Sequence, residues 1–245
     1  MGPGAARAAA VSVVAVAALV AGSAPALADA PEVRPTTEVA ALLTAHKVVW
    51  SLDARGARGR MVRPWRPITG GRTVLPVDAH RTTADGTRWL RVRVPGRPNG
   101  KRGWIARRGT SLSRTRWQVV ISTRSRRLRV YHRGRMARAF PAAVGKPSTP
   151  TPHGRFFVEE SVRMPSGAPG GPYALALSAR SNVLQEFEGG PGQIAIHGVM
   201  GLQGRPGTSI SHGCVRVANA DSRWLAARIA PGTPVTIRRW ARGPV

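Results

Sequence analysis

The chain has 245 residues and is strongly basic, with 38 Lys and Arg against 11 Asp and Glu and a formal net charge of +27. Hydrophobic residues make up 42% of the sequence, which excludes wholesale disorder. The length allows one large domain or two modest ones. A single cysteine, Cys214, excludes a disulfide-stapled scaffold. So high a positive charge favours a polyanionic partner, which is a nucleic acid, an anionic lipid or an acidic polymer of the cell envelope.

The first 28 residues have the three parts of a secretory signal peptide. Arg7 supplies a short positive region, the stretch 8–21 is apolar and uncharged, and small residues follow up to Ala28. The apolar stretch is shorter than the roughly 20 residues that span a bilayer. We therefore expect cleavage after Ala28, with Ala30 as the second candidate, and no membrane span in the mature protein. We expect it to be secreted to the cell wall or a periplasm-like space, so nucleic acid is a poor partner and an envelope polyanion a good one.

Residues 46–112 show a rhythm of short strands, whereas residues 29–45 lack strong periodicity and predict a linker. The clearest strand is 89–94, whose apolar residues share one face while arginines take the other. Glycine and proline then turn the chain into a return strand at 103–106. This rhythm predicts a small all-β module. On the Trp-Leu-Arg-Val of the first strand and the Gly-Trp-Ile of the second, the module resembles the bacterial SH3-like modules that precede catalytic domains in exported cell-wall proteins.

A second domain is predicted over residues 116–240. Apolar runs at 117–122, 128–131 and 193–197 indicate strands. One segment breaks the β rhythm, because Asn219 can cap a short helix that ends before a Pro-Gly pair. The expected fold class is therefore mostly β, with one short helix.

Cys214 lies in the polar string Ser-His-Gly-Cys-Val-Arg at 211–216. A lone cysteine in an exported protein is either a buried small hydrophobe or a reactive thiol. Histidine and positive charge favour the nucleophilic thiolate, so these neighbours favour the reactive interpretation. His212 need not be the base, because adjacent side chains usually diverge. His197 followed by Gly198, at the end of an apolar strand, can point into a cleft.

Together with the upstream His-Gly pair, this string resembles the signature of L,D-transpeptidases with the YkuD-type catalytic domain. The Thr-Pro-Thr-Pro-His-Gly-Arg-Phe of 149–156 is similar to the family's strand entry, although His153 stands where threonine is common. The resemblance covers roughly residues 116–238. It implies a YkuD-like β-sandwich catalytic domain and acyl transfer through a cysteine.

Carried over by position, the resemblance makes Cys214 the nucleophile and His197 the general base, which the main-chain carbonyl at Gly198 orients. Three backbone N–H groups would form the oxyanion hole, those of His212, Gly213 and Cys214. Arg216 would bind a substrate carboxylate, and Ser211 would shape the loop at the substrate. Chemistry agrees, since acyl transfer needs a thiolate, a proton shuttle and donors toward the developing negative charge. Residues that we expect to line or cover the same cleft are Tyr173, Ser178 and the glycines of 167–171.

The implied reaction starts on a tetrapeptide stem of peptidoglycan. Cys214 would displace the terminal D-alanine and hold the stem as a thioester, and the amine of a neighbouring stem would then complete a 3→3 cross-link. Water as the acceptor would make the enzyme an L,D-carboxypeptidase instead. The sequence leaves open the acceptor amine, the ligand of the first module and the oligomeric state.

Two further alternatives differ in class. His197, His212 and Cys214 could supply three zinc ligands, but a basic neighbourhood opposes a divalent cation and the spacing lacks the usual ligand pattern. We therefore expect neither a metal nor a cofactor. The other alternative is a non-catalytic wall-binding protein whose basic first module binds anionic wall polymers, and the intact signature argues against it.

Overall fold

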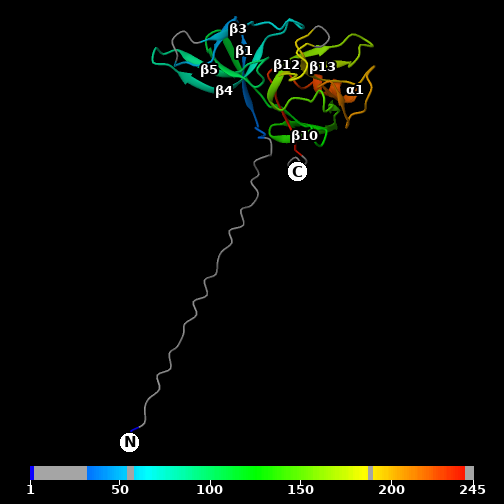
Figure 1. Cartoon of the computed structure of the whole chain (residues 1–245). Coiled ribbons are helices and arrows are strands. Elements are labelled where there is room, and N and C mark those ends of the chain that lie inside the picture. The colour runs from blue at the N-terminus through cyan, green and yellow to red at the C-terminus, as the bar shows by residue number, and fades with distance from the viewer. Residues whose placement is uncertain (3–31, 54–57, 187–189, 241–245) are drawn as a thin grey trace.

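The computed structural model describes residues 1–2, 32–53, 58–186 and 190–240. The predicted signal peptide therefore lies outside the described residues, apart from the first two. The described chain forms two large β-sheets that lie side by side, with one short helix against the second sheet (Figure 1). The mostly β fold class is thus confirmed. Among the helices of the described ranges, none is long and apolar enough to cross a membrane.

The first sheet has seven strands in the order β3-β2-β6-β5-β4-β1-β7. Their bounds are β1 Thr37–Leu42, β2 His46–Val49, β3 Gly59–Val62, β4 Val74–Thr82, β5 Arg88–Arg93, β6 Arg102–Ala106 and β7 Thr110–Thr115. Leu90 and Val92 of β5 are buried while the arginines between them are not, as alternation in a half-buried strand requires. The predicted strand and its return strand are therefore present. The resemblance of this sheet to SH3-like modules stays a prediction.

Strand β1 corrects the linker predicted over residues 29–45. Residues 37–42 pair with β4 on one side and β7 on the other, inside the first sheet. Val39, Ala40 and Leu42 are buried there. The strand has no clear alternation in the sequence, because Val39 and Ala40 are buried at consecutive positions and alanine gives a weak apolar signal. The first sheet also extends to Thr115, beyond the expected boundary at residue 112.

The second sheet has eight strands in the order β10-β9-β8-β17-β12-β13-β14-β16. Their bounds are β8 Trp117–Ser122, β9 Arg127–His132, β10 Arg135–Pro141, β12 Gly154–Arg163, β13 Tyr173–Arg180, β14 Gln193–His197, β16 Val215–Arg216 and β17 Pro234–Arg238. Two short strands, β11 (Val144–Gly145) and β15 (Ser209–Ser211), pair separately. Strand β12 pairs with β17 along its first half and with β13 along its second, with a register shift between Val158 and Glu160. One apolar cluster takes side chains from both halves of the second sheet, that is from β8 and β9 and from β13 and β14, as in a β-sandwich.

Each large sheet has its own apolar cluster, and β12 contributes to both. Phe156 packs in the cluster of the second sheet, and its neighbour Phe157 packs in the cluster of the first. Successive side chains of a strand point to opposite faces, so one strand can serve two cores. Both rings are buried. One face of β12 therefore packs in each of the two cores, and the two sheets are packed together at this strand.

The helix α1 spans Asn219–Ala226 and contacts β13 and β14. The predicted helix is present, but the predicted cap is wrong. Ala218 occupies the N-cap position and makes no side-chain capping hydrogen bond. The side-chain oxygen of Asn219 instead accepts hydrogen bonds from the main-chain N–H groups of Val199 (2.9 Å) and Met200 (3.2 Å). Asn219 thus holds the segment that follows His197.

Candidate active site

The parallel pairing of β14 with β16 brings the predicted histidine and cysteine to one end of the second sheet. Ile196 lies opposite Val215 and His197 lies opposite Arg216, so Cys214 directly precedes the strand that runs beside His197. The Sγ of Cys214 accepts a hydrogen bond from the N–H of Ala195 at 3.4 Å. Strand pairing therefore brings two residues that are 17 positions apart in the sequence to the same edge of the sheet.

The loop before Cys214 is braced from within by a serine hydroxyl. The Oγ of Ser211 donates to the carbonyl oxygen of Cys214 (2.6 Å) and accepts from the N–H of Gly213 (3.1 Å). Gly213 has φ = +121°, and a Cβ there would lie 3.0 Å from the Cδ1 of Ile194. Glycine is needed for this turn because other residues adopt such a φ only with strain. The Ser-x-Gly-Cys spacing thus specifies the shape of the loop.

A second brace comes from the Thr-Pro-Thr-Pro segment. The hydroxyl of Thr151 donates to the carbonyl of Gly213 (2.8 Å) and accepts from the N–H of Gly145 (2.9 Å). The hydroxyl of Thr149 donates to the carbonyl of Ser211 (3.2 Å). Both threonines are buried. The sequence marks this segment only as a motif. Two threonines that each precede a proline could have indicated hydroxyl groups whose partners lie elsewhere in the chain.

His197 is held in one orientation by the main chain. Its Nδ1 lies 2.7 Å from the carbonyl oxygen of Gly198, so Nδ1 carries the proton and Nε2 is left as the acceptor. This agrees with the expectation that a carbonyl orients the ring. Burial lowers the pKa of His197 below its ordinary value, and the charge of Arg216 lowers it further, while the Gly198 carbonyl opposes both. The ring is therefore neutral at pH 7 and able to accept a proton.

Gly198 leaves room for two segments that pack against the histidine. A Cβ at Gly198 would lie 2.0 Å from the carbonyl oxygen of Gly171 and 2.5 Å from the Oδ1 of Asn219. Its N–H donates to the carbonyl of Gly170 at 2.9 Å. A Cβ at Gly170 would in turn lie 2.8 Å from Nδ1 of His197. The predicted Gly-rich segment 167–171 therefore lies directly against the histidine.

Arg216 is anchored at both its backbone and its side chain. Its main chain exchanges two hydrogen bonds of 2.8 Å with Ala143, and its Nη1 donates to the carbonyl of Gln203 at 2.7 Å. The Nε is buried and has no hydrogen-bond partner among the described residues. The guanidinium therefore ties down the segment between the histidine and the cysteine while keeping a donor for another group.

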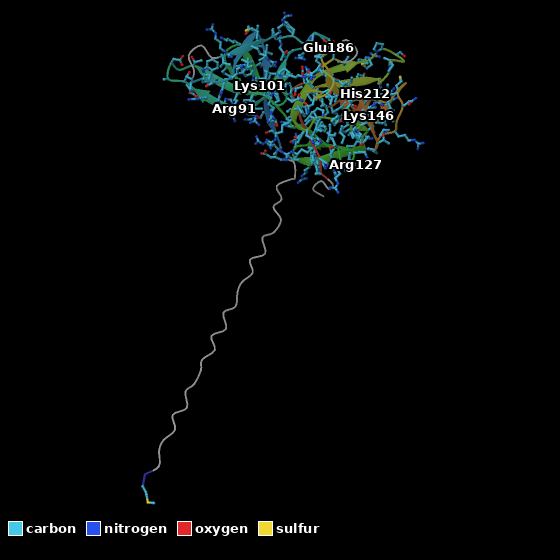
Figure 2. All side chains as sticks on the ribbon, in the orientation of Figure 1. Arg91, Lys101, Arg127, Lys146, Glu186 and His212 are labelled. Carbon is cyan, nitrogen blue, oxygen red and sulfur yellow. The ribbon has the colours of Figure 1, made fainter. Side chains whose placement is uncertain are left out.

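Three further predicted residues are buried or engaged within the protein. Ser211 is fully buried, and its hydroxyl shapes the loop. Ser178 is buried in β13, where its Oγ accepts from the N–H of Phe157 (3.1 Å) beside the register shift in β12. The N–H of Gly213 is engaged by Ser211, which argues against its expected place in the oxyanion hole. His212, by contrast, is exposed beside this loop (Figure 2).

Tyr173 lines a cavity of about 610 Å³ beside the histidine strand. It directly precedes Ala174, which pairs with His197. The same cavity is lined by Met200 and by two arginines, Arg163 of β12 and Arg223 of α1. The arginines were not singled out in the sequence, since nothing in their spacing shows that a strand and a helix bring them together. The cavity offers an aromatic ring and two guanidinium groups to a carboxylate-bearing ligand.

Within the described ranges, no group of three or more His, Cys, Asp or Glu could hold a metal ion. A thiol, a neutral imidazole with a free acceptor nitrogen and a rigid, glycine-containing loop are the groups needed for nucleophilic acyl transfer.

Comparison with known proteins identifies the second half of the chain. Residues 116–237 match the family model of the L,D-transpeptidase catalytic domain, YkuD. The YkuD protein of Bacillus licheniformis is 34% identical over 121 residues, which cover 49% of this chain and 65% of that protein. The YkuD protein of Bacillus subtilis is 32% identical over 123 residues, which cover 50% and 66%. The match thus spans just under two thirds of the length of these relatives.

Solved structures of similar fold were also found. An L,D-transpeptidase from Mycobacterium smegmatis is 18% identical, with a TM-score of 0.39 over 66% of this chain and 92% of that one. The protein Bd1075 of Bdellovibrio bacteriovorus is 27% identical, with a TM-score of 0.39 over 50% of this chain and 48% of that one.

Proposed function

We propose that the chain, whose residues 116–237 match the family model of the L,D-transpeptidase catalytic domain, is an exported enzyme that forms 3→3 cross-links between peptide stems of peptidoglycan. The observation that carries the proposal is the parallel pairing of β14 and β16, which brings a neutral, oriented histidine beside the strand that Cys214 directly precedes. Export rests on the sequence of residues 1–28.

The first half-reaction makes a thioester. Nε2 of His197 takes the proton of the Cys214 thiol, and the thiolate attacks the carbonyl carbon between the diamino acid and the terminal D-alanine. The imidazolium then gives this proton to the departing amine, the C–N bond breaks, and D-alanine leaves. The low pKa of His197 suits both steps, because a weak base readily returns its proton.

The second half-reaction transfers the stem to an acceptor. The side-chain amine of a second stem attacks the thioester carbonyl and loses a proton to His197, and the C–S bond breaks to return the thiolate of Cys214. That thiolate recovers its proton from the imidazolium. Water in place of the amine would release a tripeptide and make the enzyme an L,D-carboxypeptidase.

The surrounding residues bind the stems and hold the geometry. The cavity at Tyr173 would take one stem, with Arg163 and Arg223 binding its carboxylates. The exposed end of the Arg216 guanidinium would bind a carboxylate nearer to the cysteine. The hydroxyls of Ser211 and Thr151 keep the Cys214 loop rigid, so that the thiol is held where attack is possible.

The test is mass spectrometry of the products that the mature protein forms from a disaccharide-tetrapeptide. We expect a cross-linked dimer that has lost one D-alanine, and we expect none with Cys214→Ala or His197→Ala. The matched control is His80→Ala, which removes an exposed histidine of the first sheet and should leave product formation unchanged.

Three outcomes would overturn parts of the proposal. Tripeptide without dimer would replace transpeptidation by hydrolysis at the same site. Equal product formation by Cys214→Ala would exclude the thioester route. Unchanged substrate in every sample, with the protein still retained on purified sacculi, would favour a non-catalytic wall-binding protein.

A further inference from the structure

A cavity of about 260 Å³ lies between the two sheets, and none of its lining residues belongs to the cysteine site. Strands β4, β5 and β6 of the first sheet contribute to one wall, and β12 and β17 of the second sheet contribute to the other. We call it the arginine crevice because five arginines line it. These are Arg34, Arg91, Arg93, Arg102 and Arg155.

Two carboxylates in the crevice neutralise only part of this charge. Asp78 pairs with Arg93 (3.0 Å) and with Arg102 (2.9 Å). Glu32 pairs in the same way with two other arginines, Arg34 at 2.7 Å and Arg155 at 3.4 Å. Each acid is thus shared between two guanidinium groups. Five arginines against two carboxylates leave an excess of three positive charges around one small cavity.

Arg91 is the arginine for which the crevice has no acid. Its guanidinium lies over the ring of Trp104, 5.9 Å from the ring centre, and its Nε is buried without a hydrogen-bond partner among the described residues. A buried donor that makes no hydrogen bond reduces stability. The crowding of charges also affects Arg93, because burial lowers its pKa against the opposing effect of Asp78, and the charges of Arg102 and Arg155 lower it further. An anion in the crevice would relieve both effects.

From this geometry we propose that the arginine crevice binds a phosphate group. The planar fork of arginine matches the oxygens of phosphate in two-point contacts, and several arginines around one cavity are the usual means of phosphate recognition. A phosphodiester polymer carries one negative charge on each phosphate, so consecutive phosphates together can offset the excess of three. The source of the phosphate is a phosphodiester polymer outside the cell. This choice of source rests on the proposed export, whereas the phosphate site itself does not.

Binding would be measured by calorimetry on the mature protein, with ionic strength held constant by chloride. The probes are inorganic phosphate, a short poly(glycerol phosphate) and poly-glutamate of equal charge. We expect saturable binding of the first two and tighter binding of the polymer, because it presents several phosphates. Binding of poly-glutamate as tight as that of poly(glycerol phosphate) would overturn the choice of phosphate.

Two variants distinguish the binding of phosphate at a defined site from the general attraction of anions to a basic protein. Arg91→Gln should weaken phosphate binding at least tenfold. The matched control is Arg127→Gln, which removes one charge from an exposed position on the second sheet and should change binding less than twofold (Figure 2). Phosphate should raise the melting temperature of the unmodified protein and of Arg127→Gln, and should not raise that of Arg91→Gln.

Equal loss of affinity in both variants, or binding that never saturates, would mean non-specific attraction only and would overturn the proposal. Cross-link formation from a small disaccharide-tetrapeptide requires no polymer. Loss of phosphate binding would therefore leave the cross-linking result unchanged, and a failure of cross-linking would leave the phosphate-binding result unchanged.

Discussion

Around Cys214 the chain is braced by hydroxyl groups and main-chain hydrogen bonds, whereas the contact between the two sheets is braced by buried charges. At the cysteine, Ser211, Thr149 and Thr151 supply the hydroxyls, and the group that orients His197 is a carbonyl. At the contact between the sheets, Arg66 and Arg180 meet two consecutive glutamates of β12.

The charged contact is balanced in its own right. Glu159 pairs with Arg66 and with Arg180, the latter at 3.0 Å, and both glutamates are almost completely buried. Glu160 lies 3.5 Å from the Nε of Arg66 and accepts hydrogen bonds from the N–H (2.9 Å) and the hydroxyl (2.8 Å) of Thr69. Burial lowers the pKa of Arg180 to about 10, so it stays charged at pH 7. Two guanidinium groups and two carboxylates thus close the contact.

The difference teaches where buried charge is compatible with function. A balanced set of charges fixes two sheets in one arrangement, but beside a nucleophile it would hold the proton that catalysis must move. Uncharged braces fix the Cys214 loop just as closely, and the pKa of His197 is lowered by burial and by Arg216 and raised by the Gly198 carbonyl. The arginine crevice is the third case, in which partly exposed arginines outnumber the acids beside them.

The largest expected effect comes from breaking the balanced contact. Glu159→Ala leaves Arg180 and Arg66 without one of the two carboxylates, and it should lower the free energy of unfolding by about 3–5 kcal/mol. Urea denaturation measures this. The control, Glu186→Ala, removes an exposed acid and should stay within about 0.5 kcal/mol of the unmodified protein (Figure 2). Equal stability of the two variants would show that the buried charges do not hold the sheets together.

The next effect concerns the hydroxyl braces. Thr151→Val removes a buried donor to Gly213 and an acceptor for Gly145, so the Cys214 loop should shift and D-alanine release should slow roughly 10- to 100-fold. Thr151→Ser keeps the hydroxyl and should restore most of the rate. Rates are measured under saturating substrate, with melting curves to confirm folding. Failure of serine to restore the rate would mean that the methyl packing matters and the hydroxyl does not.

A smaller effect is the titration of His197. Because burial favours its neutral form, its pKa in the folded protein lies below the 6.5 of an exposed histidine, and the acidic limb of the rate profile should lie below pH 6.5. The free energy of unfolding also falls with falling pH. The unfolded chain binds this proton more readily, so stability decreases as the pH drops from 6.5 toward the pKa of His197 in the folded protein. Nuclear magnetic resonance of the ring, assigned with His197→Ala, measures the pKa. A value of 6.5 or above would contradict the structure.

The smallest effect would add a brace that the molecule lacks. Ala218 is at the N-cap of α1 with a φ of −59° and a ψ of 151°, which suit a capping residue, but it has no side chain to cap with. Ala218→Ser should raise the free energy of unfolding by about 0.5–1 kcal/mol. Thermal melting would detect the rise. A fall in stability would mean that the hydroxyl disturbs the segment held by Asn219.

Local patterns predicted much of this molecule. Alternation placed β5 and its return strand, and the His-Gly and Ser-His-Gly-Cys strings placed the two residues that we propose as the catalytic pair. The same local reasoning failed for β1, which has no clear alternation, and for Asn219, whose side chain turned to the segment after His197 in place of its own helix. A capping residue and a loop anchor have the same sequence signature.

What could not be predicted depends on partners distant in sequence. The hydroxyl of Thr151 meets Gly213, and the carboxylate of Glu159 meets Arg66, across 62 and 93 residues respectively. Composition revealed the excess of arginine but not which arginines share acids. Burial of Ser178 and Ser211 likewise follows from the packing of whole strands, since serine is found as often on surfaces as in such positions.

The two phenylalanines of β12 have a consequence for any attempt to divide the chain. Phe157 lies in the apolar cluster of the first sheet, although its strand belongs to the second. A fragment that starts at residue 116 would bring this ring to its surface, together with Glu159 and Glu160 stripped of Arg66. Such a fragment should self-associate through the exposed ring, and heating the intact chain should melt both halves in a single cooperative transition.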